Sequence, residues 1–560
     1  MKKSKNVLII QLTLGLLIIL SINIIGNFAF LRFDLTAEKR YTLSQPTKVL
    51  LQNLDDLVYF RVYLKGEFPS GFKRLERSTK EMLDEFRAYS KGNIEYEFIN
   101  PSENSNKKER NEGYNELVKQ GLQPTSLELS EQGGSAQKII FPGAILTYQE
   151  RELPLQLLKS QIGAHPEVMI NNSIEGLEYE LCSVIRKLTV NFKPKIGFIE
   201  GHGELSKIET QSISNTLSEH YRIDRLELNG KLDVLKGYKA IVIAKPTKAF
   251  SEEDKFIIDQ FIMQGGKVLW FIDAVSASMD SLSISPFAMG IPNELNLDDQ
   301  LFRYGVRINK DLTQDLQSGL IPINTALAGS QPKWDFFPWV YFPLLMSTSN
   351  HPIVSNLNAV KCEFASSIDT VSAPGINKKL LLKTSQTSRS VNSPVKISLQ
   401  MIKSMDDEKL FNQSFLPIAV LLDGEFSSIF ENRIPSAIAN DPSIGFKAKG
   451  IRNQMIVVSD GDIIRNQVQY SSGKAYPLGV DKYTGQEYGN MDFVLNCIDY
   501  LCDDTGMMSV RSRELKIRLL DKAKLQNDKF KWQLINVLLP ILIVLLTGIV
   551  LLFLRKRKYS

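Results

Sequence analysis

The chain has 560 residues, of which 43% are hydrophobic and 23% are charged, and its formal net charge is +5. This length predicts several compact units, and the ordinary charged fraction excludes a wholly disordered chain. The weak net charge lacks the strong basic bias of a nucleic-acid binder, and four cysteines are too few for a disulfide scaffold.

Both ends of the chain carry a long uncharged run. Residues 6–31 and 532–554 contain no charged side chain. As helices rising 1.5 Å per residue, both are long enough to cross a hydrocarbon core of about 30 Å. The first run is longer than the apolar region of a cleaved signal peptide and has no clear cleavage site after it. We therefore expect two transmembrane helices, one at each end.

Basic residues flank these two runs. Three lysines lie in the tail 1–5, and the tail 555–560 contains the sequence RKRK. The positive-inside rule then places both tails in the cytoplasm, although the connector 511–531 is also rich in lysine. Long translocated regions largely escape this rule, so the short tails decide. We expect an inner-membrane protein whose bulk lies in the periplasm.

The first unit after the membrane, residues 32–192, predicts a small α/β domain. Residues 57–64 and 94–99 are rich in aromatic and β-branched side chains, which favour strands. Between them, residues 72–89 have apolar positions at helical spacing. A second helix around residues 174–188 ends this unit.

The next unit, residues 193–510, has the clearest fold pattern. Buried-type strands alternate with amphipathic helices, which predicts a parallel sheet with right-handed crossovers. The predicted strands are 195–200, 223–228, 238–244, 267–272 and 454–459, and the predicted helices are 207–220, one between Ser251 and Gly265, and 492–502.

The middle of this unit is less regular. Residues 275–290 and 383–396 look like loops, and no pattern fixes the boundaries between about 330 and 450. Residues 336–345 (FFPWVYFPLL) are the most aromatic stretch. They predict either a core strand or an exposed binding ridge.

Familiar catalytic motifs are missing. The sequence has no G-x-x-x-x-G-K-[ST] motif, so we do not expect this chain to hydrolyse ATP. It has no G-x-S-x-G elbow or zincin helix, and its four histidines lack metal-ligand spacing. We predict no catalytic residue, no metal and no cofactor.

Acidic residues at predicted strand ends are the remaining candidates for a site. In an open α/β sheet, ligands bind beyond the carboxyl ends of the strands. The candidate ligand-binding residues there are Glu200, His202, Glu204, Asp273, Asp460 and Asp462. The alternative is structural, with Gly201 and Gly203 shaping a tight turn and the acids capping helix N-termini.

Short motifs along the whole chain form a recognisable set. They are RFDLT (32–36) with KRYTLS (39–44), GHGE (201–204), LDD (297–299) with YGV (304–306), DGD (460–462) with Asn466, PLG (477–479), and Asn490, Phe493 and Asn496. Together with the terminal span and its basic tail, this set resembles the gliding-motility-associated ABC transporter auxiliary proteins of Bacteroidetes, the GldG family. The resemblance implies a class I glutamine-amidotransferase-like fold for residues 193–510. No cysteine follows a predicted strand at a glycine-flanked turn, so amidotransferase activity is not carried over.

The resemblance also implies partners and a role. It implies a GldF-like permease and a GldA-like ATPase, and a link to gliding motility and type IX secretion. We therefore expect a non-enzymatic, substrate-binding-like auxiliary subunit of an ABC transporter. The alternative is a membrane-tethered hydrolase or carbohydrate-binding protein that uses the acidic strand ends, and a third possibility is a structural envelope scaffold.

Overall fold

The computed structural model divides the chain into two compact units, Met1–Glu514 and Leu515–Ser560. It describes residues 5–28, 42–103, 106–131, 134–159, 165–189, 193–326, 330–347, 350–404, 408–435, 441, 444–511 and 522–559. Residues 1–4 of the predicted tail, 32–41 of the motif set and 512–521 of the predicted connector lie outside these ranges.

A small α/β domain follows the first apolar helix, α1 (Lys5–Phe28). Its four-stranded sheet has the order β2-β1-β5-β6, with β1 parallel to β2 and the other neighbours antiparallel. The strands are β1 (Val58–Val62), β2 (Ile94–Phe98), β5 (Gly143–Tyr148) and β6 (Arg151–Gln156), and β3 (Thr125–Glu131) and β4 (Gly134–Ile140) form a separate hairpin. The helices are α2 (Gln45–Gln52), α3 (Ser70–Tyr89), α4 (Lys107–Lys119), α5 (Pro166–Glu175) and α6 (Leu177–Thr189).

The core of the small domain follows from its sequence pattern. Alternate residues of β1 are buried, and α3 buries Leu75, Leu83 and Phe86 on one face. These side chains form one hydrophobic cluster with residues of α6. Met507, Met508 and Val510, far along the chain, belong to the same cluster. The C-terminal segment of the folded block therefore contributes side chains to the hydrophobic core of the small N-terminal domain.

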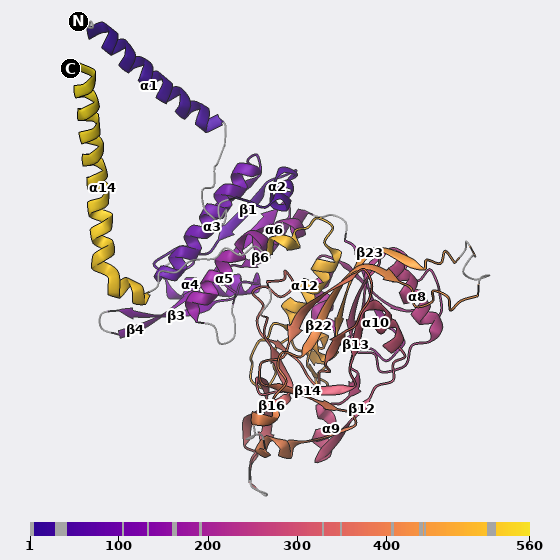
Figure 1. Cartoon of the computed structure of the whole chain (residues 1–560). Coiled ribbons are helices and arrows are strands. Elements are labelled where there is room, and N and C mark those ends of the chain that lie inside the picture. Colours follow the sequence, from indigo (N-terminus) through magenta and orange to yellow (C-terminus); the bar gives the residue numbers. More distant parts are fainter. Residues whose placement is uncertain are drawn as a thin grey trace. The chain divides into compact units, whose positions relative to one another are not determined.

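The large domain is built on a seven-stranded sheet of order β19-β22-β23-β10-β9-β7-β8 (Figure 1). The strands β8, β7, β9, β10 and β23 run parallel, which confirms the parallel pairing expected for them. Their bounds are β7 (Lys195–Glu200), β8 (Arg222–Glu227), β9 (Tyr238–Ala244), β10 (Lys267–Phe271) and β23 (Lys449–Val458). The antiparallel strands β22 (Pro417–Ser427) and β19 (Ile376–Lys383) extend the sheet.

Helices cover both faces of this sheet. On one face, α7 (Gln211–Ser218) and α12 (Asn490–Cys502) pack on Val242 and Leu269. On the other face, α8 (Glu252–Met263) and α10 (Asp298–Tyr304) pack on Ile243 and Trp270. Successive strand residues face opposite sides, so a sheet buried on both faces needs the continuous apolar runs that β9 and β10 have.

Small sheets form an additional lobe around one further hydrophobic cluster. Its elements are β11 (Val275–Ser276), α9 (Met279–Ile284), β12 (Phe287–Pro292), β14 (Asp311–Asp315), β15 (Ser318–Asn324), β16 (Trp334–Leu345), β20 (Ser388–Asn392) and β21 (Val395–Ser398). The paired strands β13 (Val306–Ile308) and β18 (Ile368–Thr370) instead bury residues in the core that α8 covers, and β17 (Val360–Lys361) buries Val360 in the core that α12 covers. The loop predictions for 275–290 and 383–396 are wrong, because β11, α9 and the start of β12 lie in the first range and β20 lies in the second. In β16, Trp339 and Tyr341 are fully buried while Trp334 and Phe336 are exposed, so this segment is a core strand with an exposed first part.

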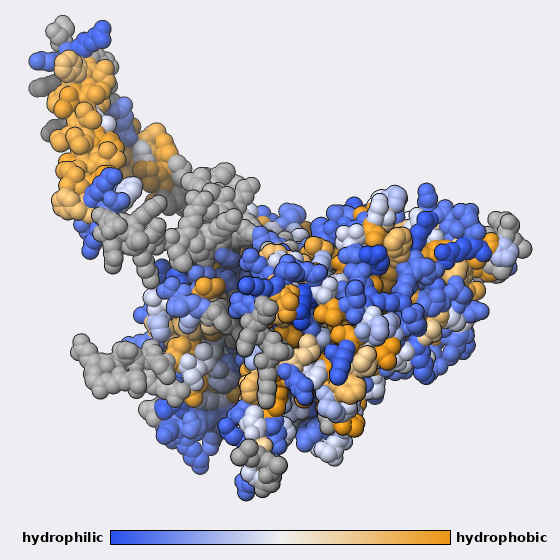
Figure 2. Space-filling view, turned by 60° about the horizontal axis from the view of Figure 1, so that its bottom comes forward, coloured by the Kyte–Doolittle hydropathy of each residue, from blue (hydrophilic) through white to orange (hydrophobic). Residues whose placement is uncertain are grey.

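The second unit contains the helix α14 (Lys522–Tyr559). Among the described residues, Asp528–Leu554 is the helical segment long and apolar enough to cross a membrane, and the apolar stretch Ile10–Ser21 of α1 is shorter. None of the apolar window of α14 is buried within the chain, and Figure 2 shows hydrophobic residues along this helix. The chain thus has a long apolar helix of membrane-spanning length at its C-terminal end and a shorter apolar stretch at its N-terminal end, and the two together suggest membrane anchoring.

Candidate functional site

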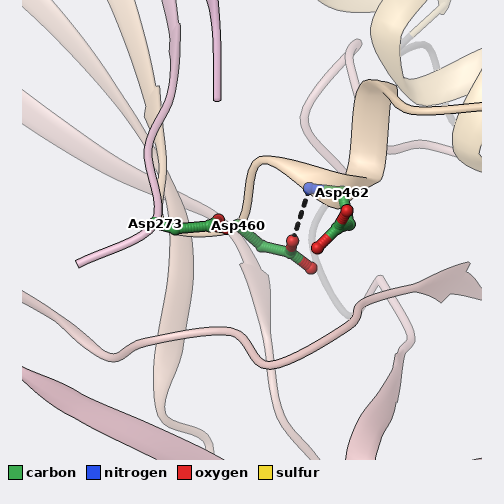
Figure 3. A group of neighbouring side chains, drawn as sticks. All are labelled: Asp273, Asp460 and Asp462. Carbon is green, nitrogen blue, oxygen red and sulfur yellow. Dashed lines mark hydrogen bonds between the residues drawn. The ribbon is translucent and has the colours of Figure 1, made fainter. Parts of the chain in front are cut away.

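Three of the candidate residues meet at the carboxyl edge of the large sheet. Asp273 follows β10, and Asp460 and Asp462 follow β23, its parallel neighbour (Figure 3). One carboxylate oxygen from each lies within 4.8 Å of the others. This is the edge at which open α/β sheets bind ligands.

A lysine that the sequence analysis did not single out lies in the same cluster. Lys245 follows β9, the neighbour of β10 on its other side. Its Nζ is 3.1 Å from Asp273 Oδ2 and forms an ion pair with Asp462. Arg465 adds a second cation, with its Nη1 3.0 Å from Asp462 Oδ1. The acidic cluster is therefore neutralised from within the chain.

Backbone groups satisfy the remaining carboxylate oxygens. Gly461 N–H donates to Asp273 Oδ1 at 2.5 Å. Asp460 accepts from Asp462 N–H at 2.7 Å, the dashed line in Figure 3, and from Glu363 N–H at 2.8 Å. Each carboxylate therefore has partners, as buried polar groups require.

Burial and mutual repulsion set the protonation of this cluster. Burial, followed by the charges of Asp462 and Asp273, raises the pKa of Asp460 well above its usual value. Burial also raises the pKa of Asp273, against the effect of Lys245. For Asp462, the effect of burial is outweighed by Lys245 and Arg465, which lower its pKa. Burial and repulsion therefore favour the protonated form of Asp460, whereas Lys245 and Arg465 favour the ionised form of Asp462.

Three carboxylates are suitable ligands for a hard divalent cation. In this cluster, however, the Lys245 ammonium already bonds to two of the three carboxylates. The geometry therefore favours an internal ion cluster over a metal centre.

The candidates His202 and Glu204 belong to a second cluster. His202 Nδ1 is 3.2 Å from Glu204 Oε1, and its Nε2 is 3.1 Å from Asp254 Oδ2 in α8. The ring stacks on Phe250 with centroids 3.7 Å apart. Burial alone would lower the pKa of His202, but the two carboxylates outweigh it and raise that pKa above its ordinary value. Both ring nitrogens are bonded to carboxylates, so His202 has a structural role in this cluster.

Glycines make the turn that holds His202. Gly201 and Gly203 have φ values of +114° and +76°, in the left-handed region that side chains disfavour. A Cβ on Gly203 would lie 2.1 Å from Thr247 Oγ1. The backbone of the turn is itself fixed, because His202 O accepts from Thr247 N–H and Lys248 N–H. The tight-turn interpretation of the glycines agrees with this geometry.

Glu200 lies apart from both clusters. Its Oε1 is 2.5 Å from Arg225 Nε in the adjacent strand β8. Arg225 also donates to Thr210 Oγ1 and Leu205 O. The structure therefore brings together Asp273, Asp460 and Asp462, pairs His202 with Glu204, and leaves Glu200 in a third ion pair.

Three of the four cysteines are buried, and Cys502 is half-buried. Cys182, Cys362 and Cys497 are buried, and burial raises the pKa of each thiol. Burial raises the pKa of Cys502, in the last turn of α12, to about 12. A nucleophilic cysteine needs a lowered pKa and access to solvent, so none of the four has the environment of one.

A separate groove of about 1540 Å³ lies in the same domain and includes none of the six candidate residues. Charged residues that line the groove pair with one another. The pairs are Arg303 with Glu431 at 2.6 Å, Arg433 with Asp299 at 2.8 Å, and Arg307 with Asp369 at 2.5 Å. Most of the groove's charge is thus compensated within the chain.

Comparison with known families agrees with an ABC transporter component. The family model described as ABC-type uncharacterized transport system matches residues 193–497, more than half of the chain. A second model, described as a domain of unknown function (DUF7088), matches residues 37–147. The chain therefore belongs to the ABC-type uncharacterized transport system family of auxiliary components.

One curated relative covers the full length. It is an uncharacterized protein of Borreliella burgdorferi, 21% identical over 570 residues and covering 99% of both chains. Among solved structures, the mmIFT52 N-terminal domain matches with 15% identity and a TM-score of 0.31, covering 55% of this chain and 96% of that one. The family membership confirms the ABC-transporter part of the sequence resemblance.

Proposed function

We propose that this chain is a non-enzymatic auxiliary subunit of an ABC transporter, held in the membrane by α1 and α14. Its transporter would contain a permease and an ATPase, of the GldF-like and GldA-like kinds that the motif set implies. The observation that carries the proposal is the union, in one chain, of a domain of this transport family with the apolar helix α14.

The exposure of α14 supports an intramembrane contact. Its apolar window buries nothing within the chain, so lipid or the helices of a partner must cover it. The charge of the two tails supports a cytoplasmic location for both termini, which would put the folded block in the periplasm.

The side-chain geometry supports a role without catalysis. The carboxylates at the strand ends are bound by Lys245, Arg465, Arg225 or His202, and three of the four cysteines are buried. Among the described residues, no feature favours a hydrolase or carbohydrate-binding function. The links to gliding motility, type IX secretion and a glutamine-amidotransferase-like fold rest on the motif resemblance and stay predictions.

Co-purification tests the proposal. The full chain, tagged and extracted in mild detergent from its own cells, should bring down one permease and one ATPase in fixed stoichiometry. A matched control lacks residues 522–560 but keeps α1 and the folded block, and it should lose most of the permease. Purification of the intact chain without any ABC subunit would contradict the proposal.

A further inference from the structure

Both membrane connections of the folded block end on the helix α6. On the N-terminal side, described residues resume at Thr42. Ser44 N–H and Thr47 Oγ1 then both donate to Glu178 Oε1, each at 2.7 Å. Thr47 and Glu178 are buried, so the entering chain is fixed to the first turn of α6.

The outgoing chain is fixed to the neighbouring residue of the same helix. The short helix α13 (Met508–Arg511) packs against α6 (Figure 1). Tyr179 O–H donates to Met508 Sδ at 3.0 Å, and the Arg511 guanidinium lies 5.5 Å from the centre of the Tyr179 ring. The two connections therefore meet at consecutive residues, Glu178 and Tyr179.

Arg511 carries the contact into the large domain. The residue is 9% exposed, and its guanidinium donates to Asn496 Oδ1 in α12 and to Ser355 O. A parallel contact joins Arg186 of α6 to Asp503, at 3.4 Å, just after α12. The helix α13, at the C-terminal end of the folded block, is thus bonded to both the small and the large domain.

The helix α12 continues to the carboxyl edge of the sheet. At its first turn, Asn490 Nδ2 donates to Lys361 O at 2.8 Å and to Ile463 O at 3.3 Å. Ile463 follows Asp462, a member of the ion cluster around Lys245. Asn490 and Asn496 belong to the motif set of the sequence, and the structure gives each a buried hydrogen bond along this path.

We infer that α6, α13 and α12 form a mechanical relay through which movement of either membrane helix reaches the ion cluster at the carboxyl edge of the large sheet. The source of that movement, ATP-driven rearrangement of a permease, rests on the proposed function. The relay itself depends only on contacts within the chain. The hydrogen bonds at Glu178 and Arg511 involve ionisable side chains that are buried, so breaking the bond to Glu178 should also weaken the packing of α13 and α12.

Hydrogen exchange on the full-length protein in detergent tests the relay without any partner. Thr47→Val removes the hydroxyl that donates to Glu178 Oε1, with little change of shape. The same hydroxyl also lies 2.7 Å from Ser44 Oγ and accepts from Cys182 Sγ at 3.4 Å, and both of these contacts are part of the entry of the chain onto α6. The substitution should raise amide exchange about tenfold in α13 and at the N-terminal half of α12, more than 400 positions away in sequence, which is the effect expected for one lost hydrogen bond to a charged group.

A matched control is available in the same domain. Thr79→Val also removes a buried threonine hydroxyl, but one that bonds only to Leu75 O within α3. It should change exchange in α3 alone. Equal effects of the two substitutions on α13, or no effect of Thr47→Val there, would overturn the relay. Failure of the transporter to co-purify with the wild-type chain would instead contradict the proposed function and leave this exchange result standing.

Discussion

Two neighbouring ion clusters end strands of the same sheet but hold different cations. Around His202, two carboxylates hold one imidazolium against an aromatic ring. Around Lys245, two carboxylates, those of Asp273 and Asp462, hold one ammonium, and Arg465 adds a second cation at the edge. In both clusters the carboxylates outweigh burial and raise the pKa of the cation, but the ordinary pKa is 6.5 for the His202 imidazole and 10.5 for the Lys245 ammonium, so His202 is the group that titrates at the lower pH.

The comparison shows that position at a strand end does not by itself define a ligand site. Both clusters lie at the carboxyl edge, where a ligand would be expected, yet in both the charges bond to one another. The structure assigns them to holding the turns after β7, β9, β10 and β23 in place. Substitutions that break either cluster should therefore lower the free energy of unfolding and should not act by removing a ligand contact.

The largest effect is expected from Lys245→Met. It removes a cation from a fully buried set of carboxylates, and breaking such a pair typically costs about 3–5 kcal/mol. The measurement is chemical unfolding of the full chain in detergent, with the exposed neighbour Lys248→Met as the matched control. If the variant does not fold, Lys245→Arg should restore folding, since the charge is kept. A loss no greater than that of Lys248→Met would contradict the cluster described above.

His202→Gln should cost less, about 2 kcal/mol near pH 6, because it exchanges charge-assisted bonds for neutral ones. The pKa of His202 is raised in the folded protein, so its stabilisation is complete below the unfolded value of about 6.5. It is then lost as the pH rises through the folded value. The difference between wild type and variant should therefore shrink from pH 6 to pH 9 in denaturant titrations. A difference that stays constant over this pH range would contradict a role for the charge of His202 in stability.

Divalent cations separate an internal ion cluster from a metal site. Wild-type protein should show no change in unfolding midpoint with millimolar Ca²⁺, Mg²⁺ or Mn²⁺, because Lys245 bonds to the carboxylates. Lys245→Met should regain about 1.4 kcal/mol at a cation concentration ten times its Kd. Stabilisation of the wild type by a cation, and its loss in Asp462→Asn, would show that the cluster binds metal after all.

The smallest effect is expected from Glu200→Gln. Its side chain is 40% exposed, and partly exposed ion pairs contribute below about 1 kcal/mol. The unfolding midpoint should move only slightly and should move less still in high salt. A loss as large as that of His202→Gln would mean that Glu200 has a role its ion pair with Arg225 does not explain.

The parallel sheet was predictable because its central strands β9 and β10 are nearly continuous apolar runs and because strands and amphipathic helices alternate along the chain. The clusters were not, since their members come from strands that the sequence separates widely. Lys245 and Asp462 are 217 residues apart in the sequence. They meet because the strands that precede them, β9 and β23, are the two neighbours of β10 in the sheet. Lys245 also lies just after a strand, β9, but it is basic, and the prediction of a site considered acidic residues at strand ends.

The prediction of a loop at residues 275–290, where β12 begins, was wrong for a different reason. Its strand exposes Phe287, Met289 and Ile291 and buries the small residues Ala288 and Gly290. Hydrophobic periodicity assumes the opposite arrangement, so the strand escaped detection. In β16 the aromatic run continues across an exposed and a buried part, and composition alone cannot show where one changes to the other.

Membrane topology is the most direct test of the account, which depends on a block tethered by both ends on the outer side of the inner membrane. Single cysteines placed at Lys119 and Lys558, in a background with the four native cysteines replaced, can be labelled with a membrane-impermeant maleimide in cells with a permeabilised outer membrane. Labelling of position 119 in intact spheroplasts, with position 558 labelled only after lysis, is the predicted result. The reverse pattern, or equal labelling of both positions before lysis, would contradict it.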